Sequence, residues 1–184
     1  MPHPALIAHN ATQFEKTVIE LRPGIWGAVG YAASCVYMVE GAQSVTIIDT
    51  TESTKAAENI LAEFRKHSTK PVGRIIYTHS HRDHISGATV FNEGRDIPII
   101  ANAAFASDLV AQDETQIAPN KALGKRTMAQ FGIGLSAQDR VSLGCGPGDR
   151  PMEGLGAGFV PPTDLITEAC DIDLDGVAAR LIMA

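Results

Sequence analysis

Three histidines and an aspartate lie within six residues, in the segment His79-Ser80-His81-Arg82-Asp83-His84. The segment directly follows the apolar run Gly73–Thr78, which is typical of a buried β-strand. Loops at the ends of buried strands present functional side chains from a rigid base. Neutral imidazole and carboxylate groups are ligands for zinc, and also for iron or manganese. The segment therefore predicts a metal site whose ligands are His79, His81, Asp83 and His84.

The spacing of these residues favours two adjacent ions. His79 and His81 can converge on one ion, and the next pair, displaced along the loop, can reach a second ion nearby. Two adjacent metal ions would bind a bridging hydroxide, which is a strong nucleophile at neutral pH because metals lower the pKa of bound water. A solvated polar loop and a chance single-metal site are the alternatives, and the density of ligand types argues against both.

The elements that would position this segment follow from the periodicity of apolar residues. Short β-rich runs, punctuated by glycine and proline, predict strands at Thr17–Leu21, Ile25–Val29, Cys35–Val39, Val45–Asp49, Gly73–Thr78 and Ile97–Ala101. Helical spacing predicts helices from the N-cap Ser53 to about Lys66, at Asn102–Gln112 and at Pro119–Phe131. A terminal hairpin is predicted from Ile172–Leu174 and Val177–Met183, joined at Asp175-Gly176. A meander followed by alternating helices and strands predicts an α/β fold.

Two segments differ from this pattern. Residues 1–14 form a polar lead-in. Residues 132–163, here called the Gly/Pro segment, are rich in glycine and proline and predict a long irregular loop. A loop of this length inside a compact domain is usually functional or mobile. We predict one domain over residues 1–184 that contains both segments.

Composition excludes several classes of protein. With 45% apolar and 20% charged residues the chain is typical of a globular protein. The net charge of −6, without a basic patch, argues against a nucleic-acid partner. No apolar run is long enough for a membrane span, and no signal peptide is visible, so we predict a soluble, cytoplasmic protein.

The three cysteines, Cys35, Cys145 and Cys170, form no CxxC pair. Neither a thiolate zinc site nor a disulfide framework is indicated. Free cysteines are among the most buried residue types, so we expect three buried thiols.

The segment from Thr78 to Gly87 resembles the HxHxDH signature of the metallo-β-lactamase superfamily. The resemblance implies an αββα sandwich with a binuclear site at the edge between its two sheets. It assigns His79 and His81 to the first metal, and Asp83 with His84 to the second. The upstream Asp49, at a strand end, then either orients a metal ligand or is a plain strand-terminal carboxylate.

Further segments resemble the alkylsulfatase branch of that superfamily, in the same order over about residues 16–183. They are Arg22-Pro23-Gly24-Ile25-Trp26, Gly30-Tyr31, the predicted helix around Asn120–Arg126, Phe131-Gly132, and Pro161–Asp164 to Asp175–Val177. The resemblance implies hydrolysis of sulfate esters of fatty alcohols, dodecyl sulfate among them, with two zinc ions as cofactor. It also implies a homodimer.

The chain departs from this branch in two respects. No histidine follows His84, whereas alkylsulfatases complete their site downstream with two glutamates and a histidine. Ala129 and Phe131 stand where family members often carry tyrosines. Glu153, Asp164 and Glu168 are the acidic candidates within the chain, but nothing marks them as ligands. We therefore expect the N-terminal portion of the domain, an incomplete first half of the sandwich.

The leading hypothesis is a metal-dependent hydrolase of sulfate esters in which Asp83 is catalytic, because it brings negative charge to the metal site. A second hypothesis keeps the fold but changes the substrate, to that of a thioesterase, lactonase or β-lactamase. A third is a truncated metal-binding fragment without catalysis. Lys125-Arg126 is either a sulfate-attracting pair or a solvated charge pair.

Overall fold

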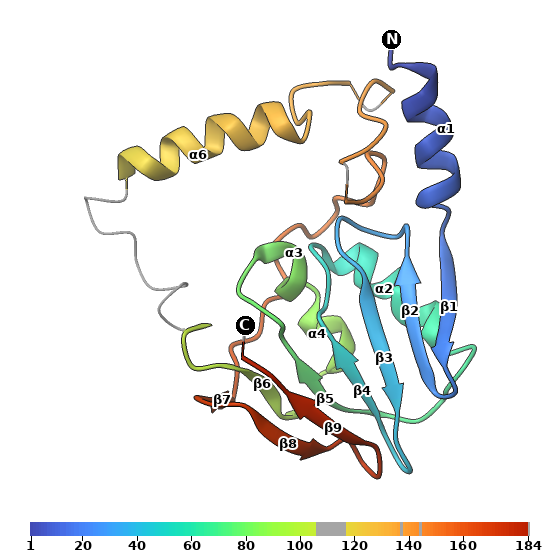
Figure 1. Ribbon diagram of the computed structural model, residues 1–184, viewed down its shortest axis with the longest axis vertical. Helices are drawn as coiled ribbons and strands as arrows, with labels where there is room; N and C mark the ends of the chain where they lie inside the picture. The colour runs from blue at the N-terminus through green and yellow to red at the C-terminus, as the bar shows by residue number, and fades with distance from the viewer. Residues whose placement is uncertain (106–116, 137, 144, 184) are drawn as a thin grey trace.

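The computed structural model describes residues 1–105, 117–136, 138–143 and 145–183 (Figure 1). The helices within these residues are α1 (Pro4–Gln13), α2 (Thr54–Phe64), α3 (Arg82–Ile85), α4 (Ala88–Phe91) and α6 (Ile117–Gln130). The strands are β1 (Thr17–Arg22), β2 (Ile25–Val29), β3 (Val36–Glu40), β4 (Val45–Ile48), β5 (Val72–Ile76), β6 (Ile99–Asn102), β7 (Asp164–Ile166), β8 (Cys170–Asp173) and β9 (Ala178–Leu181).

The main sheet has seven strands in the order β1-β2-β3-β4-β5-β6-β7. The first four strands are antiparallel neighbours, which confirms the predicted meander. From β4 onward the pairs are parallel, with Ile47 opposite Ile75 and Ile75 opposite Ile99. Parallel neighbours need a crossover connection, and α2 supplies the one between β4 and β5. The observed fold is therefore a mixed α/β sheet.

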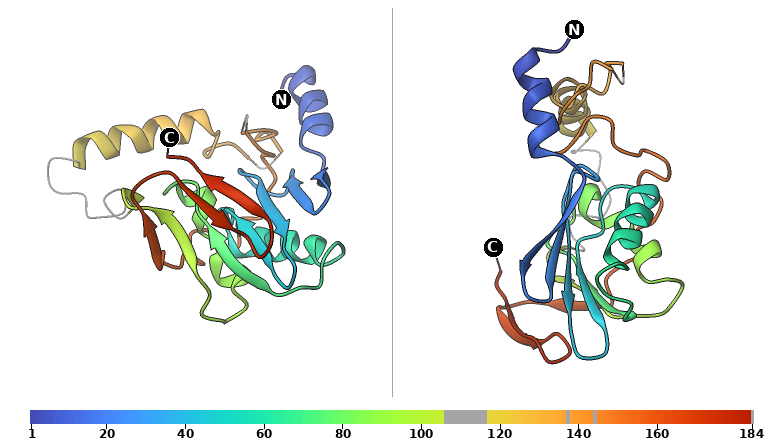
Figure 2. Two further views of the ribbon diagram at one scale, coloured as in Figure 1. Left: turned by 60° about the horizontal axis from the view of Figure 1, so that its bottom comes forward. Right: turned by 90° about the vertical axis from the view of Figure 1, so that its right-hand side faces the viewer.

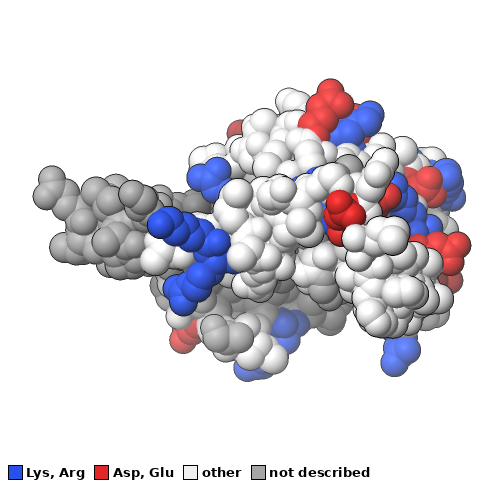
Figure 3. All heavy atoms as spheres, turned by 90° about the horizontal axis from the view of Figure 1, so that it is seen from above, with Lys and Arg blue, Asp and Glu red and all other residues white. Residues whose placement is uncertain are grey.

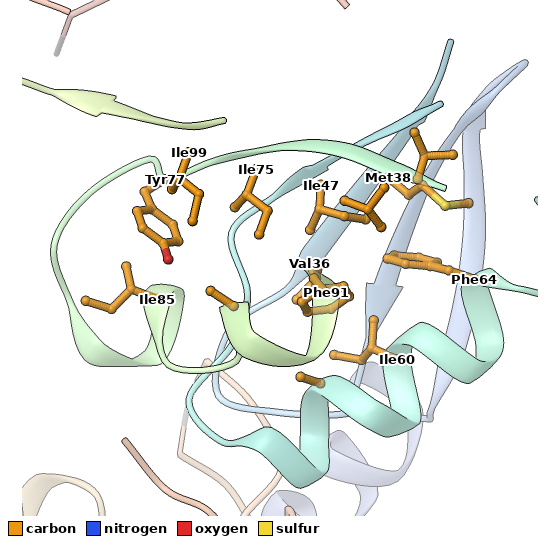
Figure 4. Packing of buried hydrophobic residues seen from close by; sticks show 14 of the residues in the cluster. Val36, Met38, Ile47, Ile60, Phe64, Ile75, Tyr77, Ile85, Phe91 and Ile99 are labelled. Atoms are coloured by element: carbon orange, nitrogen blue, oxygen red, sulfur yellow. The ribbon is translucent and has the colours of Figure 1, made fainter. Parts of the chain in front are cut away.

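Helices α2 and α4 cover one face of this sheet (Figure 2). Ser53 begins α2 as predicted, because its hydroxyl oxygen accepts a hydrogen bond from the Ala56 N–H at 3.1 Å. Ile60 and Phe64 of α2 and Phe91 of α4 pack against the strands, and all three are fully buried (Figure 4). This contact forms the main hydrophobic core and fixes the position of the strand ends that carry the histidine segment.

The hairpin β8–β9 lies on the opposite face of the sheet (Figure 2). A second apolar cluster joins Val39, Ile76 and Ile100 of the sheet to Leu174 of the hairpin turn. The turn occurs at Asp175 and Gly176, both with positive φ, as the Asp-Gly pair predicts. Helices, sheet and hairpin thus form three successive layers.

Several predicted boundaries change. The lead-in contains helix α1, although none of its side chains is buried. Strand β7 was not predicted, because its three residues leave too short a pattern to recognise. The helix predicted to begin at Asn102 is wrong at its start, since Asn102 ends β6, and its residues 106–112 lie outside the described residues.

The expectation of buried thiols is also wrong. Cys145 is exposed, whereas Cys35 and Cys170 are half-buried, and all three are free. Cys145 lies in the segment 132–163, Cys35 directly precedes β3, and Cys170 begins β8.

Charges are dispersed over the surface in Figure 3, where Lys and Arg form small separate groups on a largely uncharged face. Lys125 and Arg126 are both exposed on α6, which agrees with a solvated charge pair. Across the described part of the chain, no helix has the length and apolar character needed to cross a membrane.

Candidate metal centre

The histidine segment begins three residues after β5 and leads into the single turn α3, whose N-cap residue is His81. The ring of His79 lies 4.6 Å from that of His81 and 4.1 Å from that of His84, measured between centroids. Asp83 joins the group through its Oδ2 atom, 3.4 Å from His84 Nε2. The structure therefore brings together all four residues that the sequence predicted as metal ligands.

The side chain of Asp49 supports this cluster through hydrogen bonds. Its carboxylate is buried, follows directly on β4, and accepts a hydrogen bond from His84 Nδ1 at 2.7 Å. The same carboxylate accepts from the backbone N–H and the hydroxyl of Thr78, both at 2.8 Å. Of the two roles left open for Asp49, its contacts match the orienting one, because they hold both His84 and the start of the histidine segment.

The hydrogen bonds select one tautomer for two of the rings. The Thr78 hydroxyl donates its only proton to Asp49, so the 3.0 Å contact between Thr78 Oγ1 and His79 Nδ1 requires the ring to donate. His84 likewise donates from Nδ1 to Asp49. Nε2 is then the nitrogen that the supporting group leaves for coordination in each ring, and in His84 it lies 3.4 Å from Asp83 Oδ2.

The electrostatics of the cluster reflect two carboxylates beside one imidazole. Burial by itself would lower the pKa of His84, but hydrogen bonds to Asp49 and Asp83 outweigh it and raise that pKa to about 9. The hydrogen bond from His84 lowers the pKa of Asp83. Burial, and then the neighbouring imidazoles, lower the pKa of His79. The carboxylates thus favour a positive charge at this position.

The donor types fit a divalent cation, because the His81 and His84 rings each lie beside the His79 ring and Asp83 lies beside His84. Among the described residues, however, no three His, Cys, Asp or Glu side chains converge closely enough to form a complete metal site. The acidic candidates do not add to the cluster: Glu153 and Glu168 are exposed, and Asp164 lies in β7. His3, His9 and His67 are exposed.

The sequence profile of the metallo-β-lactamase superfamily matches residues 30–170. The chain belongs to the metallo-β-lactamase superfamily. Its fold agrees with that of a solved structure, the stereoselective inverting sec-alkylsulfatase from Pseudomonas sp., with a TM-score of 0.73 and 22% identity. The match covers 97% of this chain and 29% of that one, so the predicted fold class is confirmed for the part of the fold that the chain spans.

Among curated proteins, the chain is similar to a linear primary-alkylsulfatase from Pseudomonas sp., with 32% identity over 150 residues. It is also similar to an alkyl/aryl-sulfatase from Saccharomyces cerevisiae, with 30% identity over 167 residues. These matches cover 79% and 87% of the chain but only 28% and 25% of the relatives. The chain therefore spans about a quarter of the length of the curated relatives it matches.

The Gly/Pro segment of this metallo-β-lactamase-type domain is tied to the loops beside the cluster. Its Pro151 carbonyl accepts from the Ser53 hydroxyl at 3.0 Å, and its Gly156 N–H donates to the Glu52 carbonyl at 2.9 Å. At Gly158, a Cβ atom would lie 2.6 Å from the Ser86 carbonyl oxygen, so glycine is required for the close approach. The segment therefore borders the site.

Sequence reasoning missed one buried ion pair here. Glu52 lies in the loop after β4 and Arg150 in the Gly/Pro segment, and their side chains are 5% and 9% exposed. No local sequence motif predicts this ion pair, because the two residues are far apart along the chain.

Proposed function

We propose that the chain carries the metal-binding part of a hydrolase that cleaves alkyl sulfate esters. His79, His81, Asp83 and His84 are the proposed metal ligands, and Asp83 is the proposed catalytic residue. The observation that carries this proposal is the chain of contacts that links His81 to His79, His79 to His84, and His84 to both Asp83 and Asp49. The choice of sulfate esters rests on the similarity, at about 30% identity, to proteins named alkylsulfatases.

The proposed cofactor is a pair of zinc ions. When bound, such cations would supply Lewis acidity and an activated water molecule. The chain's own residues contribute position and charge: Asp49 holds the His84 ring, and Thr78 holds the His79 ring. Asp83 brings a negative charge next to His84 Nε2, where a cation is favoured.

The neighbouring cavity suits an amphiphilic substrate. It measures about 330 Å³, and Asp83 lines it together with Phe131, Ile133, Leu143 and Leu155. Apolar walls beside a charged group favour a molecule with a polar head and a hydrocarbon chain. We also propose a homodimer and a cytoplasmic location, which light scattering and cell fractionation of the complete protein would test.

A substrate screen of the complete protein tests the proposed function. We expect release of sulfate from octyl and dodecyl sulfate, and no comparable turnover of a thioester, a lactone or a β-lactam. Activity confined to one of those three classes would favour another hydrolase of the superfamily. If this chain by itself binds zinc but hydrolyses none of the four classes, the result indicates a metal-binding fragment without catalysis.

A further inference from the structure

Arg150 is buried beside the candidate metal centre with part of its guanidinium unused. Its Nε donates to Glu52 Oε1, which also accepts from the Ala33 N–H at 3.2 Å. Its Nη1, by contrast, is buried and has no hydrogen-bond partner within the described residues. Burial of an ion pair is costly, and an unmade hydrogen bond of a charged donor adds to that cost. Packing alone gives no reason for this arrangement.

Arg150 lines the cavity of about 330 Å³ that also reaches Asp83. The two carboxylates of this cavity are both engaged, Glu52 with Arg150 and Asp83 with His84. Arg82 contributes a second, exposed guanidinium to the same lining. The cavity therefore combines two guanidinium groups, whose carboxylate neighbours are already engaged, with apolar side chains.

A guanidinium group carries five N–H donors in a planar fork that matches the oxygens of an oxyanion. Glu52 occupies Nε and thereby fixes the plane of the Arg150 fork. The remaining donors are held in position before a ligand arrives, which lowers the entropic cost of binding.

We propose that Arg150 is a specificity-determining residue that binds a sulfate-type oxyanion in this cavity, while Glu52 acts as its positioning residue. The identification of that oxyanion as the head group of the substrate rests on the proposed function. Free inorganic sulfate and the sulfate group of an alkyl ester offer Arg150 the same oxygens. The experiment must therefore distinguish a site for the free ion from a site for the substrate head group.

The primary test is calorimetric titration of this chain with inorganic sulfate at constant ionic strength, comparing the parent with Arg150→Lys. Lysine can keep the ion pair with Glu52, but its single ammonium group lacks the planar set of donors with which a guanidinium binds a second partner. We expect binding to weaken about tenfold or more, with a nearly unchanged melting temperature. The matched control is Arg95→Lys, which alters an exposed pair with Glu93 outside the cavity and should bind as the parent does.

Sulfate binding by Arg150→Lys as strong as by the parent would overturn the proposal, as would a parent that binds no sulfate. Should the lysine variant fail to fold, the double variant Glu52→Gln/Arg150→Gln replaces the ion pair by a neutral amide pair. A folded double variant must lose sulfate binding; if it retains binding, the assignment to Arg150 is wrong.

Octane-1-sulfonate, which resists hydrolysis, distinguishes the two sources. A substrate head group predicts tighter binding of the sulfonate than of inorganic sulfate, because the apolar side chains of the cavity receive the alkyl chain. Weaker binding of the sulfonate overturns the assignment to a substrate head group. These titrations need no turnover, so sulfate binding through Arg150 without any alkyl sulfate hydrolysis would refute only the proposed function. Turnover with an unchanged KM for octyl sulfate in Arg150→Lys would refute only this inference.

Discussion

His84 lies between two carboxylates that come from different parts of the chain. Asp83 is its neighbour in sequence, whereas Asp49 reaches it from the end of β4, with a 2.7 Å hydrogen bond to Nδ1. One carboxylate therefore sets the ring orientation, and the other faces the nitrogen that remains for a ligand. This division of roles explains why the two aspartates should respond differently to substitution.

The Asp83→Asn variant tests the catalytic assignment. It preserves the shape of the side chain but removes the charge beside His84 Nε2, and an amide oxygen is a poor metal ligand. In the complete protein we expect less bound zinc and a loss of alkyl sulfate turnover of about 100-fold or more. Elemental analysis and a sulfate-release assay measure both effects.

His67→Ala is the control for this variant, because His67 is exposed, lies three residues after α2, and has its ring beside that of Trp26. Its turnover and zinc content should remain close to those of the parent. Full activity in Asp83→Asn would show that the metal assignment is wrong for this protein.

At the scale of elements, the Asp175 side chain adds polar contacts to the apolar ones that join the hairpin β8–β9 to the sheet. Asp175 accepts hydrogen bonds from the backbone N–H groups of Gln43 and Ser44 at 2.6 and 2.7 Å, and from the Ser44 hydroxyl at 3.0 Å. The first of these bonds is the main cause that lowers the pKa of Asp175. The turn between β3 and β4 is thereby joined to a hairpin more than a hundred residues further along the chain.

Asp175→Asn should loosen this connection, because a neutral amide accepts these bonds more weakly than a carboxylate. We expect faster hydrogen exchange at the β8 and β9 amides, measured by mass spectrometry near neutral pH. Since folding lowers the pKa of Asp175, its stabilising effect is present above the unfolded pKa and is lost as pH falls through the folded one. The difference from the parent should therefore vanish in acid.

Asp171→Asn is the matched control, because Asp171 lies in the same hairpin but pairs with Arg180 at the exposed surface. Its exchange should resemble that of the parent. Equal exchange in the Asp175 and Asp171 variants would contradict the proposed connection.

At the scale of the molecule, stability depends on the contact between the helices and the sheet. Phe64 is fully buried between α2 and the strands, so Phe64→Ala leaves a cavity in the main core. We expect the free energy of unfolding to fall by about 3–5 kcal/mol, measured by urea titration of this chain. Met128→Ala, at a half-exposed position on α6, should change it by less than about 0.5 kcal/mol. Similar losses for both variants would place the main core elsewhere.

The sequence by itself determined the features whose signals are local. The four clustered ligands occupy six consecutive positions after an apolar strand, and the Ser53 cap and the Asp175-Gly176 turn each depend on a few neighbouring residues. Such patterns reflect short-range constraints on the backbone, which no distant contact needs to complete. The meander of the first four strands was predictable for the same reason.

Only the tertiary structure decided which distant residues meet. Asp49 contacts His84 because the parallel register of β4 and β5 brings their carboxyl ends to one edge of the sheet. Arg150 reaches Glu52 because the Gly/Pro segment folds back along the loop after β4. β7 is a strand because β6 offers it an edge. These contacts depend on how the whole chain packs, and residue order carries no local signal of them.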